Sequence, residues 1–268
     1  MSSCPVVKAH AYGNDFLLVP ASAVPGDPAA TARRLCDRHR GVGADGLILY
    51  ETRPRGATMR LVNADGSHAE ISGNGLRCLA ALCARDEDLP VGASLRVETD
   101  AGPKVLELLG RNGAQWSFRA GMGQPTDVRQ IELPVAGEVV RVVTLWMGNP
   151  QCIVLGPLPD SERFATLGRA LATHVHFPAG SNVEFVHVET PGQLRILIWE
   201  RGVGPTSASG TGASASAVAA AAHGGASRRC EVVSPGGAQW VDWTDDGVFL
   251  TGSAEIVLDG HAHVADGA

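Results

Sequence analysis

Lysine is almost absent from this sequence, which contains only Lys8 and Lys104. Pyridoxal enzymes hold their cofactor through a lysine side chain, and neither lysine stands in a recognisable pyridoxal-binding motif. The glycine-rich turns that cradle phosphates or dinucleotides are also missing. We therefore expect a protein that works without a cofactor and without a resident metal.

Long apolar runs and basic blocks are missing as well. No stretch approaches the roughly 18 apolar residues needed for a membrane-spanning helix. The formal net charge is −6, with 22 basic and 28 acidic residues and no cluster of cations, which argues against nucleic acid as a partner. The N-terminus lacks a basic start followed by an apolar core, so we expect a cytoplasmic protein without a signal peptide.

The cysteines show no paired spacing of the kind that zinc sites use. We expect reduced thiols, and we expect Cys78 and Cys83 to be small buried side chains. The six cysteines are Cys4, Cys36, Cys78, Cys83, Cys152 and Cys230.

Short apolar segments separated by turns dominate the chain and predict many strands and few helices. Asn-Gly and Asp-Gly pairs near residues 112 and 246 predict hairpins. The predicted strands of the first half are residues 16–19, 46–50, 57–63 and 94–99, and those of the second half include 139–149, 182–188 and 195–201. The predicted helices are residues 27–39, 74–85, 161–173 and 211–223.

Two similar turns lie about half the chain apart. Ser72 begins SGNGLRCLAALCA and Ser209 begins SGTGASASAVAAAA, so a serine and two glycines precede a small-residue helix in both places. The order of strands around each turn is also similar, which indicates an internal duplication. A helix enclosed by a curved sheet has little room for large side chains. The many small residues after each serine therefore predict a helix at the centre of each sheet.

The start of each helix is a candidate anion site. Backbone N–H groups in the first turn have no partner inside the helix, and the helix dipole is positive there. An anion such as a carboxylate is attracted to this arrangement. Alternatively, Ser72 and Ser209 are ordinary helix caps and the glycines only permit tight turns.

Motifs along nearly the whole chain resemble the diaminopimelate epimerase family. They are AYGNDFLLV, RHRGVGADGLI, VNADGSHAEISGNGLRC, TLWMGNPQC, GSNVEFV, WERGVGPTSASGTGA and SPGGAQWVDW followed by LTGSAE. The resemblance implies an α/β fold of two pseudo-symmetric domains, each a curved, mostly antiparallel sheet around a central helix. We place these domains at residues 1–119 and 120–257, with the tail from about residue 258 packing on the first.

The resemblance also implies an activity: cofactor-independent epimerisation of LL- to meso-diaminopimelate, in lysine and peptidoglycan biosynthesis. Its partner is a small amino-acid substrate, with neither nucleic acid nor membrane, and the sequence leaves a homodimer open. The positions that match substrate-binding residues of the family are Asn14, Asn63, Gly73, Asn74, Asn149, Asn182, Glu200, Arg201, Gly210 and Thr211.

The sequence departs from the family at the positions that carry the chemistry. The family uses two cysteines, where this chain has Ser72 and Ser209, and a histidine, where it has Gln151. A hydroxyl is far less acidic than a thiol and needs a neighbour to take its proton. Glu200 is the nearest ionisable candidate by motif, so the expected catalytic set is Ser72, Ser209, Glu200 and Gln151.

Several alternatives stay open at this point. The serines could be engineered replacements, or they could belong to a divergent isomerase or lyase, or to a binding protein without turnover. A serine hydrolase is disfavoured because neither serine stands in a GxSxG elbow. His174 and His176 lack a third metal ligand, and Asp45 is interpreted as a turn residue.

Overall fold

The computed structural model describes residues 2–24, 26–69 and 71–264, and the chain divides into two compact units. The first unit is Met1–Ala120 with Gly252–Ala268, and the second is Gly121–Thr251. Strand β8 (Gln115–Gly123) carries the chain into the second unit, and β17 (Gly247–Val264) carries it back. The return to the first unit at Gly252 comes earlier than the predicted position near residue 258.

The first unit is a curved sheet with alternating strand directions. Pairs β1–β2, β3–β4, β6–β7 and β7–β8 are antiparallel, whereas β2–β3 and β4–β6 are parallel. Strand β17 pairs antiparallel with β1. The strands are β1 (Ser2–Ala11), β2 (Asn14–Pro20), β3 (Gly46–Arg53), β4 (Gly56–Asn63), β5 (His68–Ala69), β6 (Ser94–Glu98) and β7 (Lys104–Asn112).

The second unit repeats the same series of pairings. Pairs β10–β11, β12–β13, β15–β16 and β16–β17 are antiparallel, β11–β12 and β13–β15 are parallel, and β9 pairs with β10 as β17 does with β1. The duplication indicated by the sequence is therefore present in the topology. The strands are β9 (Thr126–Val135), β10 (Glu138–Trp146), β11 (Pro150–Leu155), β12 (Asn182–Thr190), β13 (Gln193–Glu200), β14 (Gly204–Thr206), β15 (Arg229–Ser234) and β16 (Gly237–Thr244).

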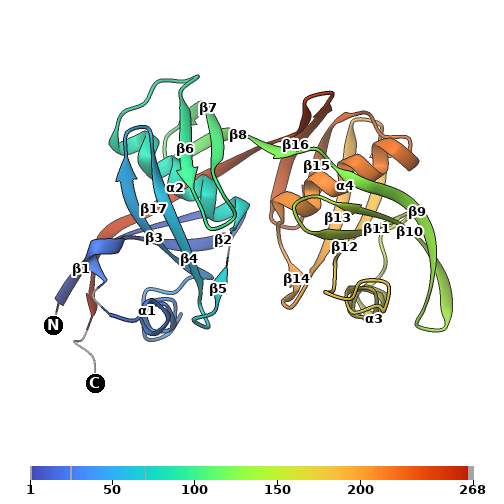
Figure 1. Ribbon diagram of the computed structural model, residues 1–268, viewed down its shortest axis with the longest axis horizontal. Helices are drawn as coiled ribbons and strands as arrows, with labels where there is room; N and C mark the ends of the chain where they lie inside the picture. The colour runs from blue at the N-terminus through green and yellow to red at the C-terminus, as the bar shows by residue number, and fades with distance from the viewer. Residues whose placement is uncertain (1, 25, 70, 265–268) are drawn as a thin grey trace. The chain divides into compact units, whose positions relative to one another are not determined.

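Each sheet surrounds one helix, as predicted (Figure 1). Helix α2 (Gly73–Asp86) is buried from Asn74 to Ala84, and α4 (Gly210–His223) is buried along most of its length. The strand-rich α/β fold predicted from the sequence is confirmed. Although both helices are rich in small apolar residues, no helix in the described ranges is long and apolar enough to cross a membrane.

The remaining helices lie at equivalent places in the two units. Helix α1 (Pro28–Leu35) connects β2 to β3, and α3 (Ser161–Ala172) connects β11 to β12; a short 3-10 helix, η1 (Ala21–Ala23), precedes α1. Asp27 and Asp160 cap α1 and α3 by accepting backbone N–H groups.

The prediction that the first helix continues to His39 was wrong. After Leu35 the Asp37 carboxylate accepts the backbone N–H groups of His39 and Arg40. The Leu35 carbonyl accepts those of Val42 and Gly43. These side-chain and turn hydrogen bonds satisfy the backbone without further helix.

The enclosed helices predict where substitutions are costly. Leu79, in α2, has no exposed surface, whereas Leu109, on β7, is 39% exposed. We expect Leu79→Ala to lower the free energy of unfolding by about 2–5 kcal/mol, because it leaves a cavity among close-packed groups. Leu109→Ala should cost less than about 1 kcal/mol. Urea unfolding followed by circular dichroism measures both, and equal losses would contradict an enclosed α2.

Candidate active site

Ser72 and Ser209 cap the two enclosed helices in the same way. Each has an extended backbone, and its Oγ accepts the N–H of the residue three positions on, Gly75 or Gly212, at 3.1 Å. The Ser209 hydroxyl also lies 3.4 Å from Thr211 Oγ1. Both serines are thus fixed at the first turn of a helix.

A side chain at the second glycine of each motif would displace a neighbouring side chain. A Cβ on Gly75 would lie 2.9 Å from Ile48 Cδ1, and a Cβ on Gly212 would lie 2.5 Å from Glu184 Oε1. Each helix start is therefore pressed against a side chain of the strand beneath it. The strand residue is apolar in the first unit and a carboxyl group in the second.

The first-turn amides give each unit a site with donor character. The N–H groups of Gly73, Asn74, Gly210 and Thr211 belong to turns that offer no intrahelical acceptor. The positive end of the helix dipole adds to their attraction for a carboxylate. Each unit therefore supplies a helix end with the chemistry to attract an anion, and a serine hydroxyl lies beside it.

In the first unit, Asn14 is held between α2 and the turn before β3. Its Nδ2 donates to Asp45 Oδ2 at 2.7 Å, and its Oδ1 accepts from Asn74 Nδ2 at 3.1 Å. Asn74 Oδ1 in turn accepts from the buried guanidinium of Arg77. Arg77 also packs 5.6 Å from the centroid of the Tyr12 ring. The structure thus brings the predicted residues Asn14 and Asn74 together.

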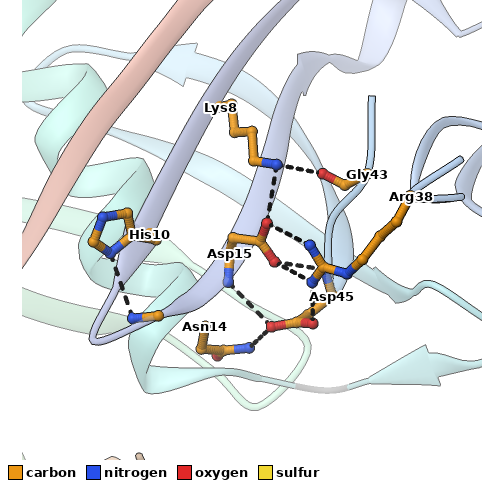
Figure 2. Close-up of polar contacts among 8 residues, drawn as sticks. Lys8, His10, Asn14, Asp15, Arg38, Gly43 and Asp45 are labelled. Carbon is orange, nitrogen blue, oxygen red and sulfur yellow. Dashed lines mark hydrogen bonds and ion pairs between the residues drawn. The ribbon is translucent and has the colours of Figure 1, made fainter. Parts of the chain in front are cut away.

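Asp15 and Asp45 form the base of this arrangement (Figure 2). The Arg38 guanidinium bridges Asp15 and Asp45 at 2.7 Å, and Lys8 lies 3.0 Å from Asp15. Burial raises the pKa of the Asp15 carboxyl, but hydrogen bonds from Arg38 and Lys8 outweigh burial and hold this pKa below its usual value. The interpretation of Asp45 as a turn residue was incomplete, because its side chain positions Asn14.

Asn63 makes a different contact from the other predicted residues of this unit. It ends β4, where its Nδ2 donates to Ser67 Oγ at 2.9 Å. Among the described hydrogen bonds, its side chain is joined to a neighbouring turn rather than to Asn14 or Asn74. The role predicted for Asn63 stays a prediction.

In the second unit, three adjacent strands bring Gln151, Asn182 and Arg201 together. Gln151 and Asn182 are register partners on β11 and β12. Asn182 Oδ1 accepts the Arg201 N–H at 2.9 Å. In one orientation the Gln151 amide donates to Asn149 Oδ1, and in the other it donates to both Glu184 oxygens at 3.1 Å and accepts from Asn182 Nδ2 at 3.2 Å.

Glu184 is the functional candidate that the sequence analysis missed. Its side chain is fully buried, and burial, reinforced by repulsion from Glu200, raises its pKa well above the usual value. Burial also raises the pKa of Glu200 at the end of β13. The available signal was one glutamate within the apolar strand NVEFV, since buried acids are rare without a specific reason.

The cysteines and His174 make none of the hydrogen bonds described above. All six cysteines are free and buried, and burial raises the pKa of Cys78 and Cys83 to about 12. Their prediction as small buried groups is confirmed. His174 contacts the Pro134 carbonyl at 3.1 Å, and no group of three potential metal ligands occurs among the described residues.

The two capping serines predict a measurable contribution to stability. Ser72→Ala and Ser209→Ala each remove an acceptor from a first-turn amide, and we expect each to cost about 0.5–2 kcal/mol. Ser72→Asp and Ser209→Asp keep a capping oxygen and should retain most of that stability. Thermal unfolding of the four variants tests this, and alanine variants as stable as the parent would refute the capping role.

The pKa of Asp15 predicts an acid-dependent stability. Because its pKa is lower in the folded than in the unfolded protein, Asp15 stabilises the fold above the unfolded value of about 4. That contribution is lost as pH falls through the folded pKa. We expect Asp15→Asn to be less stable than the parent at pH 7 and to differ less from it in acid. Urea unfolding at several pH values measures the difference, and a pH-independent difference would contradict the ion pairs.

The chain is similar to known proteins along nearly its whole length. The sequence pattern of the family described as diaminopimelate epimerase matches residues 6–128 and 143–257. The diaminopimelate epimerase of Desulforudis audaxviator (strain MP104C) is 43% identical, with 94% of this chain and 97% of that protein covered. The chloroplastic diaminopimelate epimerase of Oryza sativa subsp. japonica is 38% identical, with 96% and 79% covered.

A solved structure shares the fold at low sequence identity. A hydroxyproline epimerase from Agrobacterium vitis superposes with a TM-score of 0.67 at 17% identity, covering 98% of this chain and 92% of its own. The sequence matches support an isomerase that epimerises an amino acid. With both halves matched by one family, the chain belongs to the diaminopimelate epimerase family.

Proposed function

We propose that this protein interconverts LL- and meso-diaminopimelate without a cofactor, using Ser72 and Ser209 at the positions where the family uses cysteines. In this reaction a proton leaves the α-carbon and another is delivered to its opposite face. The product serves lysine and peptidoglycan biosynthesis, and we place the protein in the cytoplasm.

The observation that carries this proposal is the matched pair of helix starts. Both have a hydroxyl fixed beside first-turn amides, and both hydroxyls occupy the same place in a duplicated unit. Amides at a helix N-terminus stabilise a carboxylate and the greater charge that develops when its α-carbon loses a proton. The unit that supplies the hydroxyl therefore also lowers the cost of making the carbanion.

The serine pair makes the proton transfers harder than a thiol pair would. A thiol ionises near pH 8.5 and lower beside a helix N-terminus, whereas a hydroxyl does not ionise near neutral pH. A serine can remove a proton only if another group accepts its own. We therefore expect slower turnover than a cysteine pair would give, and a requirement for the carboxyl groups Glu184 and Glu200.

The distal end of the substrate is assigned to polar groups at the ends of strands. Asn63, Asn182, Glu200 and Arg201 match the family positions for a second amino-acid head, and Asn14 and Asn149 complete the polar set. The hydrogen bond between Asn182 and the Arg201 backbone supports this assignment by fixing the two residues relative to each other. The partner is a small molecule rather than nucleic acid or membrane, and a homodimer stays open.

A second candidate function is binding of diaminopimelate without turnover. The capping hydrogen bonds of both serines favour it, because they account for the hydroxyls without any chemistry. The two candidates predict the same ligand and differ only in exchange at the α-carbon. A divergent isomerase or lyase, the remaining alternative, would act on a related amino acid instead of diaminopimelate.

Isotope exchange tests the proposal directly. LL-diaminopimelate is incubated in D₂O with the unmodified protein and, in parallel, with Ser72→Cys/Ser209→Cys, and the α-proton signal is followed by NMR. We expect both proteins to exchange the α-proton. The cysteine variant should be faster by about 10²-fold or more, a factor of the size that general acid–base catalysis contributes.

Each outcome selects among the candidates. Exchange only with the cysteine variant would establish a diaminopimelate site without turnover, and would refute the catalytic role of the serines. No exchange with either protein would refute diaminopimelate as the substrate. The Ser72→Ala/Ser209→Ala variant is the control, because it retains the backbone amides and lacks both hydroxyls.

A further inference from the structure

Glu184 lies inside the second unit, against the first turn of α4. Its side chain has no exposed surface. A Cβ built on Gly212 would lie 2.5 Å from Glu184 Oε1 and 3.1 Å from Ser209 Oγ. The carboxyl and the hydroxyl therefore both lie close to Gly212.

The duplicated unit shows that packing alone does not require a carboxyl at this place. In the first unit Ile48 of β3 fills the equivalent position, where its Cδ1 lies 2.9 Å from a Cβ built on Gly75. Gly75 and Gly212 are equivalent residues of the two serine motifs. Ile48 is fully buried and belongs to the apolar core. A hydrocarbon therefore meets the steric requirement, and Glu184 needs another explanation.

A chain of hydrogen bonds ends at Glu184. The Arg201 N–H donates to Asn182 Oδ1. With its nitrogen directed at Glu184, Gln151 accepts from Asn182 Nδ2 and donates to both carboxyl oxygens. Every donor in this series points toward Glu184. These donors, together with the positive end of the α4 dipole, are suited to stabilise a charge that forms transiently on its carboxyl.

The groups around Glu184 favour its protonated form at rest. Burial and the nearby Glu200 carboxyl of β13 both raise its pKa. Burial raises the pKa of the Cys152 thiol on β11, so this neighbouring group is also kept neutral. Residues 209–222 of α4 contain no ionisable carboxyl, imidazole, amine or guanidinium group. These surroundings therefore favour a neutral carboxyl at Glu184 over a charged one.

We propose that Glu184 is a positioning residue that exchanges a proton with Ser209 and so allows a serine to replace a thiol. This inference rests on the proposed function. When Ser209 delivers its proton to the substrate carbanion, the electron pair on carbon forms the new C–H bond. The Glu184 proton then passes to Ser209 Oγ and leaves a carboxylate. In the reverse direction Ser209 Oγ takes the α-proton while its own proton passes to that carboxylate.

The coupling between positions 184 and 209 can be measured without turnover. Ser209→Cys introduces a half-buried thiol, whereas the natural cysteines are buried. The rate of its alkylation by iodoacetamide is followed from pH 5 to 10, with and without Glu184→Gln. We expect two ionisations in the Ser209→Cys profile and one in the double variant, because an amide cannot titrate. Superimposable profiles would overturn the proposal.

Exchange kinetics in the native serine background provide the second measurement. An amide matches a protonated carboxyl in size and neutrality, so a merely structural Glu184 would tolerate Glu184→Gln. We expect instead a loss of about 10²-fold or more in α-proton exchange, within the range of general acid–base effects, with little change in KM. Unchanged exchange in a folded Glu184→Gln protein would refute the proton transfer. If that variant does not fold, Glu184→Ile, which copies Ile48 of the first unit, takes its place in both measurements.

The matched control is Glu189→Gln on the same strand, where the carboxylate pairs with Arg195 at 2.7 Å at the strand end. It should alter neither measurement, and an equal effect of Glu189→Gln would contradict a specific role for Glu184. Failure of the proposed function can be told apart from failure of the Glu184 proposal. The alkylation profile tests the coupling between positions 184 and 209 even if diaminopimelate is not exchanged.

Discussion

The enclosure of one helix by a curved sheet is the constraint on which the rest of this structure depends. Enclosure favours small side chains, and a methyl group at Gly75 or Gly212 would displace the Ile48 or Glu184 side chain. It also leaves the first-turn amides of α2 and α4 as the polar end of an otherwise apolar interior. The same requirement that shapes the core therefore places two donor-rich helix ends next to two hydroxyls.

The two units share one architecture but bury different ionisable groups near the enclosed helix. In the first unit a buried guanidinium, Arg77, supports Asn74 and Asn14 from within α2. The equivalent position of α4 holds Ser214, whose hydroxyl donates to the Gly210 carbonyl. In the second unit the buried ionisable group is Glu184, supplied by a strand. The packing is the same in both units, while one holds a buried guanidinium and the other a buried carboxyl.

Much of this architecture could be predicted from the sequence because it depends on local patterns. The spacing of Ser72 and Ser209 to their Ala-rich helices, and the Asn-Gly and Asp-Gly turns, identified the duplicated units. The helix at residues 27–39 was predicted too long, since side-chain capping by Asp37 competes with propensity. The contact of Glu184 with Gln151 joins strands that only the folded sheet places in register. Such partners leave no pattern of spacing, so sequence reasoning reached the serines but not the carboxyl beside them.

The path of the chain sets an order of assembly. The second unit is continuous from Gly121 to Thr251, whereas the first needs residues from both ends of the chain. Strand β1 is synthesised before the second unit, but its partner in β17 is completed only after that unit. During translation the second unit can complete its sheet while an edge of the first stays open. Exposed strand edges promote association between chains, so pairing of β17 with β1 protects the first unit from aggregation.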